Sequence, residues 1–192
     1  SGSRVVASEK IQSQGNMIST ENSLDMAIEG QGHFQILQQD GNFAYTRDGS
    51  FMLSEEGELV TASGLLLQPQ IVVPPEANSI TIGRDGTVSV ELANGGGAQQ
   101  LGQIQIARFV NPAGLEAMGA NLFKPTTASG QPLILNPTEQ GAGALAQGML
   151  EASNVNVVEE LVTMIETQRA YEVNSKAISA IDSMLRFLNN NL

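Results

Sequence analysis

The 192-residue sequence has no cysteine and a single histidine, His33. It therefore cannot form a disulfide, a thiol nucleophile or a zinc site built from cysteine and histidine ligands. Nine basic residues stand against 20 acidic ones, which gives a formal net charge of -11. Because nucleic acids and anionic membranes are bound through clustered basic residues, this balance argues against both as partners. No apolar run approaches the ~20 residues of a membrane-spanning helix, so we predict no membrane insertion.

Aromatic residues are also scarce, at 4%, whereas glycine is frequent with 20 residues. Short apolar runs recur between residues 24 and 109 and are separated by Gly-rich or acidic turns, a pattern typical of strands. Three Asp-Gly pairs lie between such runs, and hairpin turns of two residues favour this pair because both residues accept a positive φ. We therefore predict hairpins whose turns depend on Gly41, Gly49 and Gly86.

Two stretches of the β region differ in their pattern. Around the Asp85-Gly86 pair the alternation is regular, and it predicts one buried face made by Ile80, Ile82, Val88 and Val90. Residues 111–148 contain four of the seven prolines and little sustained alternation. For this second stretch we predict mostly irregular chain that returns to one end of the β region.

After residue 153 the pattern changes to that of one long helix. Asn156 and Glu159 form a capping pair, and neither Gly nor Pro occurs from Val157 to Leu188. Such a helix measures ~48 Å, longer than most helices of globular domains. Residues at steps of three or four draw one stripe along it: Val157, Leu161, Met164, Gln168, Tyr171, Ser175, Ile178, Ile181, Leu185 and Leu188. A narrow stripe with polar members favours a coiled-coil seam, and the alternative is a helix packed along its own β region.

These patterns predict a chain that is mainly β with one long C-terminal α-helix able to form a coiled coil. We divide it into a connecting segment (residues 1–23), a β-rich domain (residues 24–152) and a C-terminal helical segment (residues 153–192).

None of the local motifs predicts a catalytic, cofactor-binding or metal site. The Gly30-Gln31-Gly32 stretch lacks the third glycine of a dinucleotide fingerprint and leads into a strand. Asp40-Gly41-Asn42 lacks the alternating oxygen ligands and the closing Glu of a calcium loop. The acidic residues of 55–58 cluster at a predicted turn, whereas a glycosidase needs two carboxylates across a cleft. We predict no enzymatic activity, no cofactor and no metal, and we assign His33 a structural role.

Five stretches together carry a resemblance to a known family. They are SNVNVVEELVTMIETQRAYEVN from Ser153, LDMAIEGQGHFQI from Leu24, AYTRDGSF from Ala44, GELVT from Gly57 and ITIGRDGTVSV from Ile80. The first resembles the C-terminal signature of the bacterial flagellar axial proteins, the rod and hook family. The other four resemble, in order, the β-domain motifs of that family, most closely those of its distal-rod members. The sequence has no counterpart of the family's first helical segment, and His33 stands where the family commonly has an aromatic residue.

The resemblance implies a structural subunit of the flagellar distal rod. Such a subunit self-assembles into a helical drive shaft that transmits torque from the basal body to the hook, with a hairpin-rich outer domain around a coiled-coil core. The resemblance also implies export through the flagellar type III apparatus without a cleaved signal peptide, and a place in the periplasmic part of the basal body. The implied partners are identical copies, neighbouring rod and hook proteins and the surrounding ring proteins, and the stripe, Ser175 apart, would make the assembly contacts.

Two alternatives stay open at this point. One is a proximal-rod or hook subunit of the same family, which the N-terminal sequence would discriminate. The other is a secreted carbohydrate-active enzyme, which requires two converging carboxylates and would reveal itself by hydrolysis of a soluble glycan.

Overall fold

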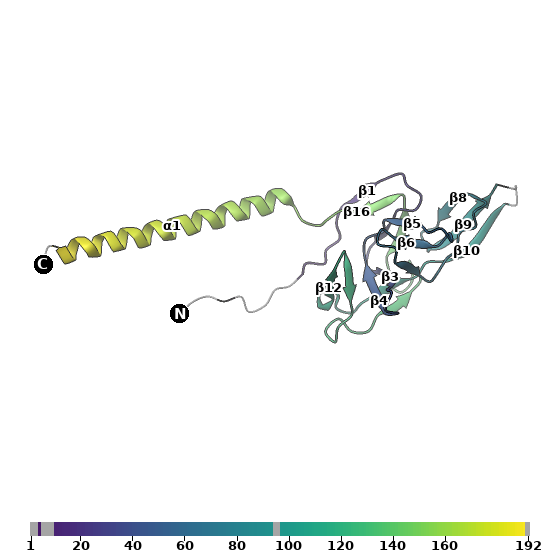
Figure 1. Cartoon of the computed structure of the whole chain (residues 1–192), viewed down its shortest axis with the longest axis horizontal. Coiled ribbons are helices and arrows are strands. Elements are labelled where there is room, and N and C mark those ends of the chain that lie inside the picture. Colours follow the sequence, from purple (N-terminus) through teal and green to yellow (C-terminus); the bar gives the residue numbers. More distant parts are fainter. Residues whose placement is uncertain (1–3, 5–9, 94–96, 191–192) are drawn as a thin grey trace. The chain divides into compact units, whose positions relative to one another are not determined.

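The structure of the chain is a computed structural model that describes residues 4, 10–93 and 97–190, with side chains up to residue 186. It divides into two compact units, Ser1–Ser153 and Asn154–Leu192. We call the first the β unit, because its regular structure is almost entirely strand, and the second the helical unit (Figure 1). This architecture confirms the predicted fold class.

The largest sheet of the β unit is antiparallel and is centred on β3 (His33–Leu37). β3 pairs with β4 along one edge and with both β7 and β11 along the other. The strand order is β12-β13-β4-β3-β7-β6-β5, and β11 also pairs with β14. The other strands of this sheet are β4 (Phe43–Thr46), β5 (Phe51–Leu53), β6 (Leu59–Thr61), β7 (Leu66–Gln68), β11 (Ile106–Arg108), β12 (Glu116–Gly119), β13 (Leu122–Lys124) and β14 (Leu133–Leu135).

Smaller antiparallel sheets complete the β unit (Figure 1). One has the order β10-β9-β8 and consists of β8 (Ala77–Ile82), β9 (Thr87–Leu92) and β10 (Ala98–Gln103). β2 (Met26–Glu29) pairs with β15 (Ala144–Gln147), and β1 (Met17–Ser19) pairs with β16 (Met149–Glu151). A short 3-10 helix, η1, spans Pro112–Gly114.

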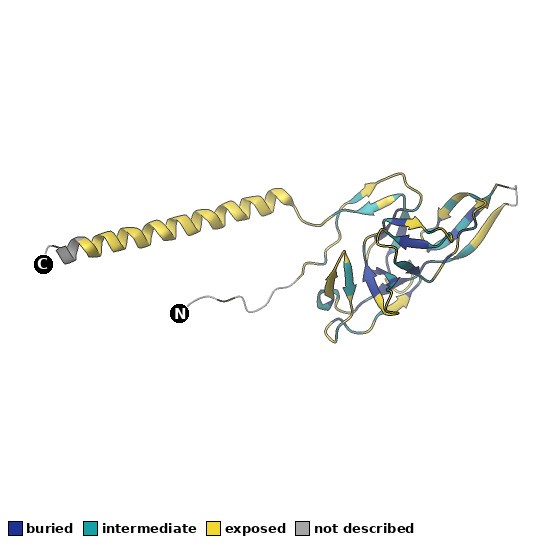
Figure 2. Cartoon of the chain, viewed as in Figure 1, coloured by how far each residue is buried: buried dark blue, intermediate teal, exposed yellow. Residues whose placement is uncertain are grey.

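One main hydrophobic core holds the β unit together (Figure 2). Its fully buried members come from segments far apart in the sequence and include Met26, Ile28, Phe34, Ile36, Phe51, Leu67, Val88, Ile104, Ile106 and Leu145. The predicted face around the Asp85-Gly86 turn is confirmed, because Ile82, Val88 and Val90 are buried and the half-buried Ile80 packs against the core. Ile80 faces Val90, and Ile82 faces Val88, across the β8–β9 ladder.

The turns at Gly41 and Gly86 join strands that do pair, β3 with β4 and β8 with β9. Both glycines have a positive φ, +81° and +84°. Their loops have three residues instead of the predicted two: the Gly41 N–H donates to the Gln38 carbonyl, and the Gln38 N–H donates to the Asn42 carbonyl. This is the arrangement of a type I turn closed by a glycine bulge, in which the left-handed glycine restores the strand pairing.

The prediction for Gly49 is wrong. In the described part of the chain β4 and β5 do not pair with each other, and Gly49 does not have a left-handed φ. The glycine is required for a different reason: a Cβ at this position would overlap the main-chain carbonyl oxygen of Met26. The carbonyl of Gly49 in turn accepts a hydrogen bond of 3.0 Å from the Met26 N–H. Gly49 therefore allows two backbone segments to approach closely.

The prediction of mostly irregular chain for residues 111–148 is also wrong in part. This stretch contains η1 and the strands β12, β13, β14 and β15. Except for β12, which pairs with its neighbour β13, these strands are ordered by distant partners: β13 by β4, β14 by β11 and β15 by β2. Strands of three or four residues are too short to produce a visible alternation, so their order comes from tertiary pairing.

The helical unit contains one helix, α1 (Val157–Asn190), which begins at the predicted residue. The Asn156 side-chain oxygen accepts a hydrogen bond of 3.2 Å from the Val158 N–H, which is the N-cap interaction expected there. Glu159 and Glu160 lie in the first turn, where the helix dipole stabilises negative charge.

Candidate assembly surface

Helix α1 exposes its apolar side chains. Every side chain described from Val157 to Arg186 is exposed (Figure 2). Among the large apolar residues of this range, the exposed fraction runs from 48% at Ile165 to 78% at Tyr171. Large exposed apolar surfaces are typical of interaction sites, because their contact with water is unfavourable.

The predicted stripe lies within this exposed surface. Val157, Leu161, Met164, Tyr171, Ile178, Ile181 and Leu185 are all more than half exposed, and the polar member Gln168 is exposed as well. The side chain of Leu188 lies outside those that the structure describes. The stripe did not include five further exposed apolar residues, Val158, Val162, Ile165, Val173 and Met184. These residues are found when all apolar residues are projected around the helix axis, and not only along one heptad stripe.

The chain enters and leaves the β unit along one two-stranded ladder. β1 and β16 lie side by side, with Met17 opposite Glu151 and Ser19 opposite Met149 (Figure 1). The ladder continues at both ends, since the Ala152 N–H donates to the Asn16 carbonyl and the Thr20 N–H donates to the Gly148 carbonyl. Residues 149–152 are therefore fixed to the β unit directly before the chain continues into α1.

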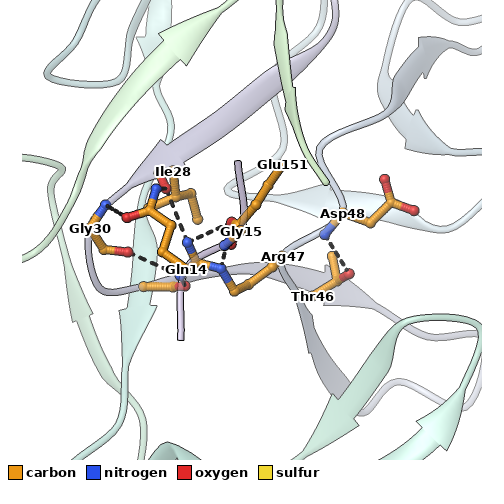
Figure 3. A network of polar contacts seen from close by, with 9 residues as sticks. Gln14, Gly15, Ile28, Gly30, Thr46, Arg47, Asp48 and Glu151 are labelled. Carbon is orange, nitrogen blue, oxygen red and sulfur yellow. Dashed lines mark hydrogen bonds and ion pairs between the residues drawn. The ribbon is translucent and has the colours of Figure 1, made fainter. Parts of the chain in front are cut away.

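Arg47 reinforces this ladder through its contact with Glu151 of β16 (Figure 3). Its guanidinium forms an ion pair of 2.6 Å with Glu151, whose side chain is only 9% exposed. The remaining N–H groups donate to the carbonyls of Gly30, Gly32 and Ile28.

The second oxygen of Glu151 accepts a hydrogen bond of 2.9 Å from the Gly15 N–H (Figure 3). The Gln14 amide bridges the same loop, because it donates to the Ile28 carbonyl and accepts from the Gly30 N–H. The ion pair of Arg47 and Glu151 thus links the residues before β1, the β2–β3 loop and β16. The sequence predicts no role for Arg47, because its pairing with a residue 104 positions away leaves no local signal.

His33 lies beside this network and is 4% exposed. Its ring meets Phe109 and Phe123 edge-on, with centroids 5.6 Å and 6.1 Å away. Neither ring nitrogen has a hydrogen-bond partner among the described residues. Burial, together with the positive charge of Arg47, lowers the pKa of His33 from 6.5 to about 4. A neutral ring with two aromatic neighbours packs as a third aromatic residue would.

A half-open hollow of about 270 Å³ lies between Gln12, Gln14, His33, Arg47 and Arg108. No carboxylate belongs to the described residues that line it, so the hollow does not supply the pair of acids that the glycosidase alternative requires. Within the described ranges, no three His, Cys, Asp or Glu residues gather in a way that could hold a metal ion. The described helix is also not apolar enough to cross a membrane.

The comparisons with known proteins agree with this architecture. Residues 27–90 match the family described as "Flagellar hook protein FlgE/F/G D1 domain", and residues 146–191 match "Flagellar basal body rod FlgEFG protein C-terminal". The flagellar basal-body rod protein FlgG of Buchnera aphidicola (subsp. Schizaphis graminum) is 52% identical over 97% of this chain and 72% of its own length. FlgG of Borreliella burgdorferi is 51% identical over 98% and 72%. FlgG of Caulobacter vibrioides is 47% identical over 92% and 68%. The chain belongs to the family of flagellar basal-body rod proteins.

Proposed function

We propose that this chain is the structural subunit of the flagellar distal rod and that its copies assemble through helix α1 into a shaft that transmits torque. The observation that carries the proposal is that the large apolar side chains described on α1, from Val157 to Leu185, are about half exposed or more, whereas the β unit buries its own core. The relatives support the distal type: in Caulobacter vibrioides the identity is 47% with FlgG and 38% with FlgF.

Membership of the family places the protein in the flagellar basal body, together with other rod and hook components. We further propose that identical copies form its main contacts, that ring proteins surround it, and that it reaches the periplasm by type III export without a cleaved signal peptide. A subunit of this kind works by packing and needs no active site, so we propose no enzymatic activity.

The energetic reason for assembly lies in the exposed side chains. Full burial of one large aliphatic side chain stabilises by roughly 1.5–3 kcal/mol, so a side chain that is already half covered gains about 1 kcal/mol. Six to eight such residues on each helix are enough to offset part of the entropy that copies lose when they associate.

The β1–β16 ladder and the Arg47–Glu151 ion pair supply the mechanical part of the proposal. A load that reaches α1 passes through residues 149–152, which the ladder and the ion pair hold on the β unit. Breaking this connection requires several hydrogen bonds to open together, because the ladder and the guanidinium share the same short segment.

The test is genetic complementation in a flagellated bacterium that lacks its own copy of the gene. The unmodified gene is expected to restore rods and swimming, and a variant with Leu161→Asp and Ile178→Asp is expected to restore neither. A matched control adds the same two charges at polar positions of the same helix, Thr163→Asp and Ser179→Asp.

Electron microscopy of basal bodies distinguishes the outcomes. Arrest before the distal rod is complete supports the proposal, whereas normal rods without a hook in the deletion strain contradict it. Swimming of the Leu161→Asp, Ile178→Asp strain contradicts the role of the helix. Loss of swimming supports it when the thermal unfolding of the β unit is the same in this variant and in the control variant.

A further inference from the structure

Arg108, on β11, differs from Arg47 and Arg84 because it has no carboxylate partner. Ion pairs neutralise three basic residues of the β unit: Arg47 with Glu151, Arg84 with Glu29 and Lys124 with Glu116. None of the acidic side chains that the structure describes pairs with Arg108. Arg108 therefore keeps an uncompensated positive charge on a chain whose formal net charge is -11.

Two neutral oxygens hold the Arg108 side chain in place. Its Nε–H donates to Oε1 of Gln31 over 3.1 Å, and Nη1 donates to the Gln140 carbonyl over 2.8 Å. A guanidinium has five N–H groups, so both on Nη2 and the second on Nη1 are left without an acceptor among the described residues. A guanidinium fixed in this way is suited to a planar anion, because little further ordering is needed when the anion binds.

Arg108 borders the hollow of about 270 Å³ together with Arg47 and His33. The two arginines do not contribute equally to this hollow. Each N–H group of Arg47 already has an acceptor, and Glu151 balances its charge. The net charge beside the hollow is therefore close to one positive unit, which a single carboxylate balances and a doubly charged phosphate exceeds.

His33 gives a second, independent sign that a further group belongs in the hollow. Its ring is only 4% exposed, and both ring nitrogens lack a hydrogen-bond partner among the residues described. Buried polar atoms of this kind are uncommon in folded proteins and call for an additional partner such as a water or an ion. The hollow, which His33 lines, is where such a partner can enter.

We infer that this hollow is a binding site for a carboxylate group, which Arg108 holds through its unpaired Nη N–H groups. The hollow, at about 270 Å³, has room for about nine water molecules at ~30 Å³ each. It lies at the small end of the range for ligand sites. A small organic acid or the end of one acidic side chain fits these dimensions.

Two sources can supply the carboxylate. One is a free small acid. The other is the turn of residues 54–58, between β5 and β6, on a second copy of the chain. Glu55 and Glu56 are exposed there, and neither forms an ion pair within the described ranges. The turn is well defined, because the Gly57 N–H donates to the Ser54 carbonyl and the Ser54 N–H donates to the Glu58 carbonyl.

A titration of the full chain with sodium formate, followed by nuclear magnetic resonance, tests the site. Formate is the smallest carboxylate and stays ionised at pH 5, and it replaces chloride at constant ionic strength. The Nε–H signal of Arg108 is expected to shift and to saturate. Arg108→Gln is expected to weaken formate binding by about tenfold or more, because charge-assisted hydrogen bonds are lost. Arg108→Lys, which keeps the charge without the planar fork, is expected to retain part of the affinity.

The matched control is Arg84→Gln, which removes an arginine that does not line the hollow and is already paired with Glu29. It is expected to leave formate binding unchanged. If Arg108→Gln fails to fold, as judged by its thermal unfolding, the titration of the unmodified chain and the Arg108→Lys variant still decide the result.

The signals of the His33 ring provide a further readout. A negative charge in the hollow offsets the effect of Arg47, so formate is expected to raise the pKa of His33 above its value of about 4. The other charged groups on the elements around the ring are Glu151, Arg108 and Lys10, whose ammonium lies over the Phe123 ring. Formate changes none of their ion pairs, because Arg108 and Lys10 have no such pair in the described chain and Glu151 stays on Arg47.

Dilution of the chain without formate identifies the source of the carboxylate. If a second copy supplies it, the Arg108 signal shifts with protein concentration, and Glu55→Gln with Glu56→Gln removes this shift. Glu21→Gln with Glu76→Gln, a change of two other exposed glutamates, is the control. If the source is a free acid, the signal depends on formate and not on protein concentration.

Three results overturn the inference: an Arg108 signal that formate does not saturate, an equal loss of binding in Arg84→Gln, and a pKa of His33 that formate leaves unchanged. These results do not affect the proposed assembly through α1, because Arg108 and the turn of residues 54–58 both lie in the β unit.

Discussion

The β unit and helix α1 contain the same kinds of large apolar residues and use them differently. Phe34 and Ile36 are fully buried in the β unit, whereas Leu161 and Ile178 are more than half exposed on the helix. The β unit brings together strands from residue 26 to residue 147, so its apolar faces meet one another. A single helix has no second layer of its own against which to bury a face. Apolar residues thus stabilise the fold in one region and are available for assembly in the other.

The largest effect expected from this comparison is the loss of a core side chain. Phe34→Ala is expected to destabilise the β unit by about 3–5 kcal/mol, because it removes the ring that packs edge-on against Phe51. Leu161→Ala is expected to change the stability of the isolated chain by less than about 0.5 kcal/mol, because that side chain is exposed. Urea unfolding followed by near-ultraviolet circular dichroism measures both. Similar losses in the two variants would remove the distinction between core and assembly surface.

Within the β unit, the two glycines that were predicted to act alike are expected to differ. Gly49→Ala is expected to cost about 3 kcal/mol, because its Cβ requires the backbone of Met26 to shift. Gly41→Ala is expected to cost about 1 kcal/mol, because its φ of +81° is strained but the surrounding space is open. Denaturant midpoints of the two variants decide the order, and a larger loss at Gly41 contradicts the close approach seen at Gly49.

Two ion pairs of the β unit test how burial changes the contribution of an ion pair to stability. Glu151→Gln is expected to cost about 2–3 kcal/mol, because Arg47 is then left without its counter-charge in a largely buried network. The control is Glu29→Gln, which breaks the ion pair between Glu29 and Arg84. These two side chains are 57% and 70% exposed, respectively, so the substitution is expected to cost less than about 0.5 kcal/mol. Equal losses measured by thermal unfolding would mean that the Arg47 network adds nothing to the ladder.

His33 is expected to make the β unit sensitive to pH. Its pKa is about 4 in the folded chain and 6.5 as a free side chain, so between these values the unfolded chain binds a proton that the folded chain does not. Stability is therefore lost as the pH falls, by about 2 kcal/mol between pH 7 and pH 5.

His33→Phe is expected to remove this loss in that pH range. Hydrogen bonds, chiefly from their own turns, lower the pKa values of Asp40, Asp48 and Asp85. The folded chain therefore loses the stability that these carboxylates contribute only below about pH 4. Unfolding midpoints of both chains at pH 7 and pH 5 provide the measurement. An unchanged pH dependence in the variant contradicts the assignment to His33.

The smallest effect concerns metal. We expect a chelator to leave the melting temperature of the chain unchanged, because its described acidic residues and His33 do not gather into a ligand set. A decrease of several degrees, measured by calorimetry, would reveal a metal site in the β unit.

The structure agrees with the sequence most closely where contacts are local. The capping residue Asn156, the hairpin glycines Gly41 and Gly86, and the alternation around residue 85 all depend on neighbours within about six residues, so their patterns are visible in the chain. The exposed apolar side chains of α1 are visible too, but one heptad stripe misses five of them. The four short strands of residues 111–148 carry no comparable pattern.

The long helix and the β class of the remainder follow from the amino-acid sequence, because side-chain periods within one segment specify them. The family follows from the resemblance of five sequence stretches. The need for glycine at position 49 and the contacts of Arg47 follow only from the folded chain. The first depends on the approach of the Met26 backbone, and the second on an ion pair to Glu151, 104 residues away. Contacts of such separation form only when the whole sheet is assembled, and no pattern within one strand encodes them.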